Sequence, residues 1–213
     1  MALALIGLTL FAAQPSYATG AVSITGGDVI WGTGGTHCTV GFNVHDRDGA
    51  PALLTAGHCG TGVRDWYADA ELTQHVARTA LVDFPGGDFT LAVYDPGVSA
   101  PSAVNLHDGT FQPITGPGEA TVGERVARSG GRTGVRTGTV TGLNVTVNFP
   151  EGTVTGLIQT TVCGEPGDDG GSLYDGSTAL GFAVGGSGDC ASGGETFYEP
   201  VTTVLAAAGA TLP

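Results

Sequence analysis

Basic residues are scarce in this chain: 7 of its 213 residues are Lys or Arg, against 20 that are Asp or Glu. The formal net charge is therefore -13 at pH 7, and no basic stripe compensates it. A chain of this kind repels phosphate backbones and anionic membrane surfaces at neutral pH. We therefore expect no nucleic acid and no membrane as partner, and we attribute the acidity to a solvated surface that keeps the protein soluble.

A hydrophobic run long enough to span a bilayer is also missing. The apolar stretch at the amino terminus runs only from Ala2 to about Ala13 and ends in Ser16-Tyr17-Ala18, a small-x-small pattern that suits signal peptidase. No basic segment precedes it, which fits a signal peptide that is incomplete at its amino terminus. We predict that residues 1–20 are a signal peptide, that 21–213 form the mature domain, and that the protein is secreted.

Long amphipathic helices are absent from the pattern, whereas glycine is abundant, with 38 residues. Short runs rich in Thr, Val and Ser, such as 38–44, 89–94 and 180–184, favour strands separated by tight turns. Only residues 199–209 have apolar side chains at helical spacing. The expected fold class is therefore all-β with a short C-terminal helix.

A stretch rich in Pro, Gly and Asp, residues 96–118, is the best candidate for a crossing between two halves. It predicts one barrel at about 24–100 and a second at about 112–200 within a chain long enough to bury a core in each.

Four cysteines remain after the signal peptide: Cys38, Cys59, Cys163 and Cys190. Export and an even count favour disulfides, although three pairings are possible. No C-x-x-C motif occurs and the histidines are scattered, so a zinc site is disfavoured and no cofactor is expected.

Three segments far apart in the sequence together predict one active site. They read LTAGHC at 54–59, GGDFTLA at 86–92 and CGEPGDDGGS at 163–172. Histidine, aspartate and a glycine-rich nucleophile loop follow one another in the chymotrypsin order of the catalytic triad.

These segments resemble the streptogrisins, the bacterial secreted branch of the chymotrypsin-like serine proteases, and the resemblance extends from Ile24 to the C-terminal helix. Further matching segments are ITGG at 24–27, GFNV at 41–44, LNVTVN at 143–148 and GGSGDC at 185–190. The resemblance implies two six-stranded antiparallel β-barrels with the active site in the cleft between them. It also implies the disulfides Cys38–Cys59 and Cys163–Cys190. We expect a monomer whose cleft takes a peptide or protein substrate, or a protease inhibitor.

Individual roles follow from the same resemblance. His58 matches the general base, and Asp88 matches the buried carboxylate that orients its imidazole. The backbone N–H groups of Gly167 and Asp169 match the oxyanion hole. Asp168 matches a buried aspartate that shapes the loop.

The implied substrate pocket and its support come from several segments. We expect Arg128 to be the cationic partner that the buried Asp168 requires. No acidic residue stands just before Cys163 and no histidine stands at Ala183, which disfavours basic or glutamate side chains in the pocket. The implied pocket walls are Glu165, Pro166, Val184, Gly185, Gly186 and Ser187.

Asp169 occupies the position at which the family has its nucleophilic serine. Attack of a carboxylate on an amide would give a mixed anhydride from a weak nucleophile and a poor leaving group. Asp169 and Asp88 would also flank His58 and hold it as an imidazolium. Val184 is a second difference from the family pattern. The family usually has a serine at this position, which helps to hold a buried aspartate, and valine cannot donate that hydrogen bond.

The preferred hypothesis is therefore a secreted streptogrisin-like serine endopeptidase homologue that is inactive with Asp169. The alternative is an active serine endopeptidase that prefers large apolar residues at the cleaved position, with Asp169 an engineered change or a sequence error. Rescue by Ser172 is disfavoured because it lies beyond two glycines. A metal site of His58, Asp88 and Asp169 is the least favoured, since Asp88 is expected behind the imidazole.

Overall fold

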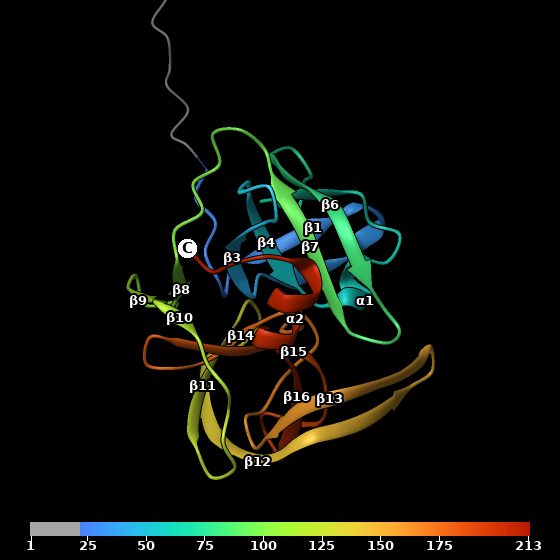
Figure 1. The fold of residues 1–213 in the computed structure, drawn as a ribbon, viewed down its shortest axis with the longest axis vertical. Helices are drawn as coiled ribbons and strands as arrows, with labels where there is room; N and C mark the ends of the chain where they lie inside the picture. Colours follow the sequence, from blue (N-terminus) through green and yellow to red (C-terminus); the bar gives the residue numbers. More distant parts are fainter. Residues whose placement is uncertain (1–21) are drawn as a thin grey trace, which may run out of the picture.

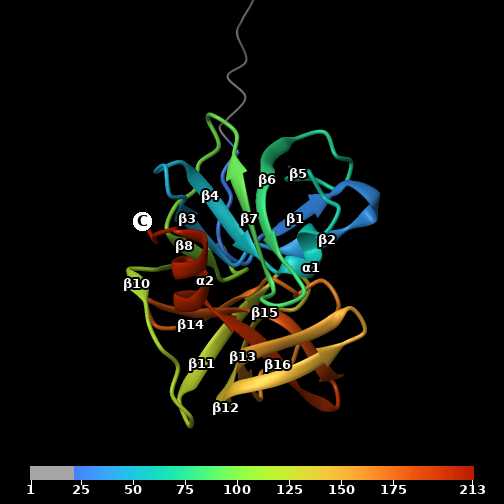
Figure 2. The same cartoon turned by 45° about the vertical axis from the view of Figure 1, so that its right-hand side comes forward.

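The computed structural model describes residues 22–213, so the predicted signal peptide lies outside the described residues. Two curled sheets lie one above the other, the first half of the chain forming the upper sheet and the second half the lower (Figure 1). A second direction of view shows the same two layers (Figure 2). Within 22–213, no helix is long and apolar enough to cross a membrane.

The first sheet closes on itself. Its strands pair in the order β2-β1-β5-β6-β7-β4-β3, and every pairing is antiparallel. Only Val40 and Gly41 separate β2 from β3, so the two ends of this order are halves of one interrupted strand and the barrel has six strands. Its segments are β1 (Val29–Gly32), β2 (His37–Thr39), β3 (Phe42–His45), β4 (Pro51–Thr55), β5 (Asp65–Tyr67), β6 (His75–Asp83) and β7 (Phe89–Tyr94).

The second sheet also closes, because β15 pairs with both β14 and β16 in the order β10-β15-β14-β11-β12-β13-β16. The two predicted six-stranded antiparallel barrels are thus confirmed, and β10 is an addition that lies parallel to β15. The short Gly-Pro sequence of β10 carries no strand pattern. The strands are β10 (Gly116–Pro117), β11 (Arg125–Gly130), β12 (Gly134–Phe149), β13 (Gly152–Thr160), β14 (Ser172–Asp175), β15 (Thr178–Asp189) and β16 (Gly193–Pro200).

Short elements complete the chain. The connection between the barrels holds a two-stranded sheet of β8 (Ala103–Asn105) and β9 (Phe111–Pro113), within the predicted crossing at 96–118. The helix α2 (Val201–Ala208) confirms the C-terminal helix. A 3-10 turn, η1 (Thr33–Gly35), and the four-residue helix α1 (Gly57–Gly60) were not predicted, because elements this short have no periodicity.

The barrels pack directly against each other. A Cβ atom on Gly41 would lie 2.9 Å from the carbonyl oxygen of Gly170 and 3.0 Å from Cβ of Phe182, so only glycine permits this approach. The larger of the two apolar clusters joins first-barrel residues such as Leu54 and Trp66 to Phe182 of the second barrel. The two barrels therefore share one core.

Candidate active site

His58 and Asp88 meet because their strands pair. His58 lies on α1, directly after β4, and Asp88 directly precedes β7, with Thr55 opposite Thr90 in the β4–β7 ladder. Asp88 is fully buried. Its Oδ1 accepts the backbone N–H of His58 at 2.9 Å, and its Oδ2 lies 3.0 Å from His58 Nδ1. Among residues 22–213 no other donor reaches this carboxylate, so His58 alone satisfies it and Nδ1 carries its proton toward Asp88.

Asp169 lies in the loop between β13 and β14, which both barrels hold. Its carbonyl oxygen accepts the N–H of Thr39 at 2.8 Å, and the next residue, Gly170, donates to Ala183 at 2.6 Å. The Oδ2 atom of Asp169 lies 3.8 Å from Nε2 of His58. This distance is that of an ion pair and is too long for a hydrogen bond.

The imidazole of His58 thus has one carboxylate at each nitrogen. Burial alone would lower its pKa, but the carboxylates of Asp169 and Asp88 outweigh burial and raise the pKa of His58 to about 10. The side chain therefore carries a positive charge at neutral pH.

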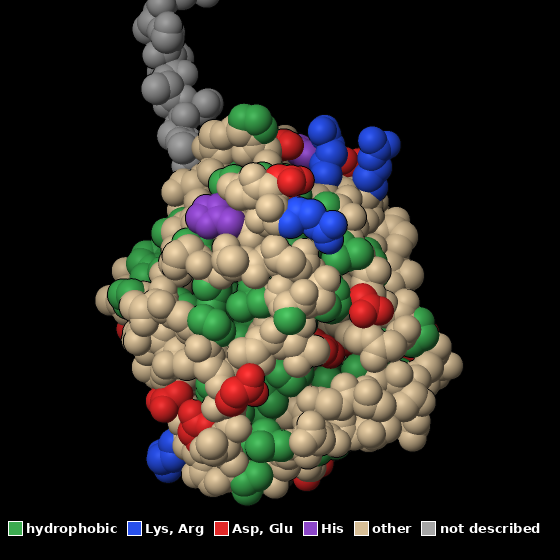
Figure 3. Space-filling view, viewed as in Figure 1, with side chains coloured by type: hydrophobic (Ala, Val, Ile, Leu, Met, Phe, Trp, Pro, Cys, Tyr) green, Lys and Arg blue, Asp and Glu red, His purple; other side chains and the backbone are tan. Residues whose placement is uncertain are grey.

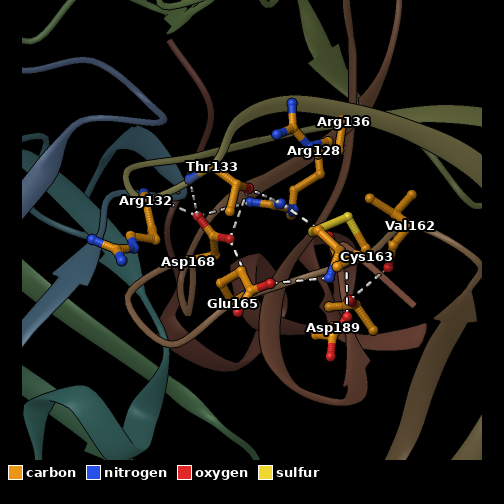
Figure 4. The surroundings of a disulfide bond; sticks show 12 residues. Arg128, Arg132, Thr133, Arg136, Val162, Cys163, Glu165, Asp168 and Asp189 are labelled. Atoms are coloured by element: carbon orange, nitrogen blue, oxygen red, sulfur yellow. Dashed lines mark hydrogen bonds and ion pairs between the residues drawn. A yellow bond between two sulfur atoms is a disulfide. The ribbon is translucent and has the colours of Figure 1, made fainter. Parts of the chain in front are cut away.

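The buried carboxylate of Asp168 holds the loop in shape (Figure 4). Arg128 on β11 lies 3.1 Å away, which confirms the predicted ion pair. The backbone N–H groups of Arg132, Thr133 and Glu165 and the hydroxyl of Thr133 also donate to it, at 2.9–3.0 Å. Burial favours the neutral acid, but Arg128 and these hydrogen bonds prevail and lower the pKa of Asp168.

Both implied disulfides are present. Cys38–Cys59 joins β2 to α1, and Cys163–Cys190 joins the start of the nucleophile loop to the segment after β15. Each disulfide fixes an element that carries part of the site.

A first cavity, of about 250 Å³, opens beside Asp169. Four of the predicted pocket residues line it: Glu165, Pro166, Gly185 and Gly186. Ser187 lines neither this cavity nor the second one described below. Thr196 of β16 also lines the cavity, and the sequence motifs did not indicate it because it faces the site only through its pairing with Gly186.

A second cavity, of about 540 Å³, is also lined by Asp169 and includes the predicted Val184. His58 forms part of its wall, and the ring of Phe84 meets the imidazole edge-on with centroids 5.9 Å apart. Phe149 and Glu151, from the tip of the β12–β13 hairpin, also line this cavity. Sequence reasoning missed Phe84, Phe149 and Glu151, because they lie outside the three motif segments.

Glu199, at the end of β16, is a further acid that sequence reasoning missed. Its Oε2 accepts the backbone N–H of Asp88 at 3.2 Å, and only 3% of the residue is exposed. Burial, together with the charges of Asp88 and Asp83, raises the pKa of Glu199 to about 7 against the opposing effect of that hydrogen bond. Glu199 is thus a third carboxyl group at the site, in contact with Asp88.

Three remaining predictions concern the oxyanion hole, Ser172 and a metal site. Among residues 22–213, no acceptor is bonded to the N–H groups of Gly167 and Asp169. The hydroxyl of Ser172 is buried and donates to the carbonyl of Gly41, so it does not reach the cleft. Asp88 and Asp169 lie on opposite nitrogens of His58, and no three His, Cys, Asp or Glu side chains of the described chain are arranged to hold a metal ion.

Comparison with known proteins places the chain among bacterial serine proteases, although no family model matches it. It is 51% identical over 188 residues to Streptogrisin-D of Streptomyces griseus, a match that covers 88% of this chain and 47% of that protein, so the chain spans about half the length of this relative. It is 48% identical over 174 residues to Serine protease 2 of Streptomyces fradiae, covering 81% of this chain and all of that protein.

Among solved structures, a chymotrypsin of Cellulomonas bogoriensis superposes with a TM-score of 0.80 at 41% identity, covering 90% of this chain and 98% of the other. With the two closed barrels and the His58–Asp88 pair in their cleft, these similarities show that the chain belongs to the streptogrisin group of chymotrypsin-like serine proteases.

Proposed function

We propose that this protein is a secreted, catalytically silent streptogrisin homologue whose cleft binds peptides. The observation that carries the proposal is Asp169 at the nucleophile position, with its carboxylate 3.8 Å from His58 Nε2. The Streptomyces relatives and the two disulfides support secretion, since disulfides persist in oxidising compartments.

Two chemical arguments support the loss of hydrolysis. A carboxylate is a weak nucleophile toward an amide, and the anhydride it would form does not resemble a stable acyl-enzyme. A histidine with a pKa of about 10 is protonated at neutral pH and cannot accept a proton as a general base. Both halves of the nucleophile–base pair are therefore disabled by one side chain.

Asp169 does not disable the groups that would bind a peptide. The oxyanion-type donors at Gly167 and Asp169 are unused by the described chain, and the Asp168–Arg128 pair supports the loop that presents them. The first cavity is lined by Ala183, Pro166 and several glycines, and by no basic residue. Two of its three acidic residues are engaged within the protein, since Asp168 pairs with Arg128 and Glu165 accepts the backbone N–H of Cys190, so we expect this cavity to take a large apolar side chain. An extended peptide or the loop of a protease inhibitor fits such a cleft.

The test is turnover of a chromogenic Ala-Ala-Pro-Phe substrate by the protein, by the single variant Asp169→Ser, and by a double variant that adds Val184→Ser. We expect no turnover by the unaltered protein and turnover by at least the double variant, since serine is the residue that the family carries at position 184. The matched control is Asp175→Ser, which removes an exposed carboxylate outside the cleft.

Two results would contradict the proposal. Cleavage by the unaltered protein, blocked by a serine-directed phosphonate, would show that another serine acts as nucleophile. Failure of Phe-containing peptides to bind the unaltered, folded protein in an anisotropy titration would show that the cleft is not a peptide site.

A further inference from the structure

The second cavity carries an uncompensated negative charge. His58 is the one cationic side chain on its wall, and Asp88 stands directly behind that imidazole at 3.0 Å. The carboxylates of Asp169 and Glu151 both line the cavity, whereas no arginine lines it and the chain contains no lysine. Asp169, the side chain that replaces the nucleophile, thus adds charge to a binding surface.

The walls of the same cavity are aromatic. Phe84 enters from the loop between β6 and β7, and Phe149 from the end of β12. The hairpin tip reaches the first barrel, since a Cβ atom on Gly152 would lie 2.6 Å from Cβ of Pro85. Figures 1 and 2 both show the β12–β13 hairpin extending toward the end of the first barrel that carries α1. The cavity is therefore framed by both barrels.

We propose that this second cavity is a subsite for a cationic side chain, the Lys or Arg of a bound peptide, with Asp169 and Glu151 binding the charge and Phe84 and Phe149 packing on its carbon chain. Long basic side chains suit such a site because their stems are apolar and their heads are charged. Aromatic faces also attract cations. The inference rests on the proposed peptide-binding function and gives it a ligand class.

The position of the basic residue in the peptide follows from the arrangement of the cavities. The two cavities share Asp169, Gly185 and Gly186 and are therefore adjacent. Side chains of an extended peptide point alternately to opposite sides. A peptide with an apolar residue in the first cavity would therefore place a neighbouring residue in the second.

The experiment is a fluorescence anisotropy titration of the whole protein with labelled, end-blocked tetrapeptides of the form Ala-Ala-Xaa-Phe. Xaa is Lys or norleucine, which has an unbranched apolar side chain without the charge, and Lys is also moved to each of the two preceding positions. We expect Lys in one position to bind roughly fivefold more tightly than norleucine at low salt, with the preference declining at high salt.

Variants identify the carboxylates. Glu151→Gln should remove most of the Lys preference without changing norleucine binding, and Asp169→Asn, a second variant, should reduce what remains. Glu71→Gln removes another exposed charge, from a loop of the first barrel, and should change nothing. Near-ultraviolet circular dichroism confirms that each variant is folded.

The outcomes test the cation subsite and the proposed peptide binding separately. If the Phe peptides bind but Lys and norleucine bind equally at every position, or if Glu151→Gln leaves the Lys preference intact, the cation subsite is wrong and peptide binding stands. If no peptide binds the folded protein, the proposed function itself fails.

Discussion

At the scale of single residues, the carboxylate of Asp169 controls the protonation state of His58. Asp169→Ser should lower the pKa of His58 from its value of about 10, because one of its two anionic neighbours is removed. NMR titration of the imidazole resonances measures this change. Asp175→Asn, which removes an exposed carboxylate from β14, should leave the titration unchanged. An unchanged His58 titration in Asp169→Ser would mean that Asp88 alone holds the proton.

Because of Glu199, we expect the free energy of unfolding to fall as pH rises. Its pKa is raised from 4.5 to about 7 in the folded protein, so the stabilisation is complete below about pH 4.5 and is lost as pH rises through 7. Glu199→Gln stays neutral throughout and should be more stable than the parent at about pH 8, by on the order of 2 kcal/mol, with equal stability near pH 4.5.

Thermal unfolding of both proteins across this pH range measures the difference. Glu195→Gln, an exposed change on the same strand, serves as the control. A Glu199→Gln protein that is destabilised equally at every pH would show that the hydrogen bond to Asp88 matters more than the charge.

The sequence predicted site residues that lie in a recognisable local motif. It did not predict residues that reach the site only through tertiary contacts. His58, Asp88 and the Asp168–Arg128 pair lie where the sequence predicted them, because each has a recognisable segment or a charge that requires a partner. Glu199 gave no such signal. A carboxylate near a strand end looks solvent-exposed until the fold covers it.

At the scale of elements, the nucleophile loop depends on a glycine. Gly170 has φ of +89°, and a Cβ atom there would lie 2.0 Å from the carbonyl oxygen of Thr39. Gly170→Ala should therefore destabilise the protein by about 2–4 kcal/mol and displace Asp169 from His58. Gly176→Ala is the matched control, because Gly176 also has positive φ but has nothing within 4 Å of the added atom.

Denaturant unfolding distinguishes the two changes. The control should cost only about 1 kcal/mol, the penalty of a left-handed backbone for alanine. Equal losses in both variants would show that the contact with Thr39 is relaxed easily and that only backbone conformation matters.

A strand whose pairing shifts register is hard to recognise in the sequence as one element. Segments 138–141 and 145–147 each have the sequence of a short separate strand, but both belong to β12, a 16-residue strand whose pairing with β13 shifts register three times. Each shift interrupts the alternation by which a strand is recognised. The hairpin that frames the second cavity therefore escaped prediction together with Phe149 and Glu151.

At the scale of the whole molecule, the two barrels should unfold as one unit. The larger apolar cluster contains residues of both barrels, whereas the smaller cluster lies within the second. Both tryptophans, Trp31 and Trp66, belong to the first barrel. Tryptophan fluorescence and far-ultraviolet circular dichroism should therefore report coincident transitions.

A core change in the second barrel sharpens this test. Leu173→Ala, in the smaller cluster, should shift the tryptophan transition as much as the circular dichroism transition, by about 2–5 kcal/mol. A tryptophan transition that does not move would mean that the barrels unfold separately.

Charge at this scale agrees with the composition. On the face shown in Figure 3, blue side chains gather at the top and at one lower corner, and no basic band crosses the surface. The acidic surface and the acidic second cavity thus favour cationic ligands of the same general kind.

The end of the chain returns to the first barrel, where Thr211 and His45 exchange two backbone hydrogen bonds of 2.8 Å. Helix α2 lies immediately before this contact and buries Val201, Val204 and Leu205. In mechanical terms, a force applied at Pro213 acts first on these two hydrogen bonds to the end of β3 and then on α2, before it breaks any strand pairing within either barrel. A molecule pulled from its C-terminus should therefore yield in a small early step that detaches the helix, with both barrels and the cleft still intact.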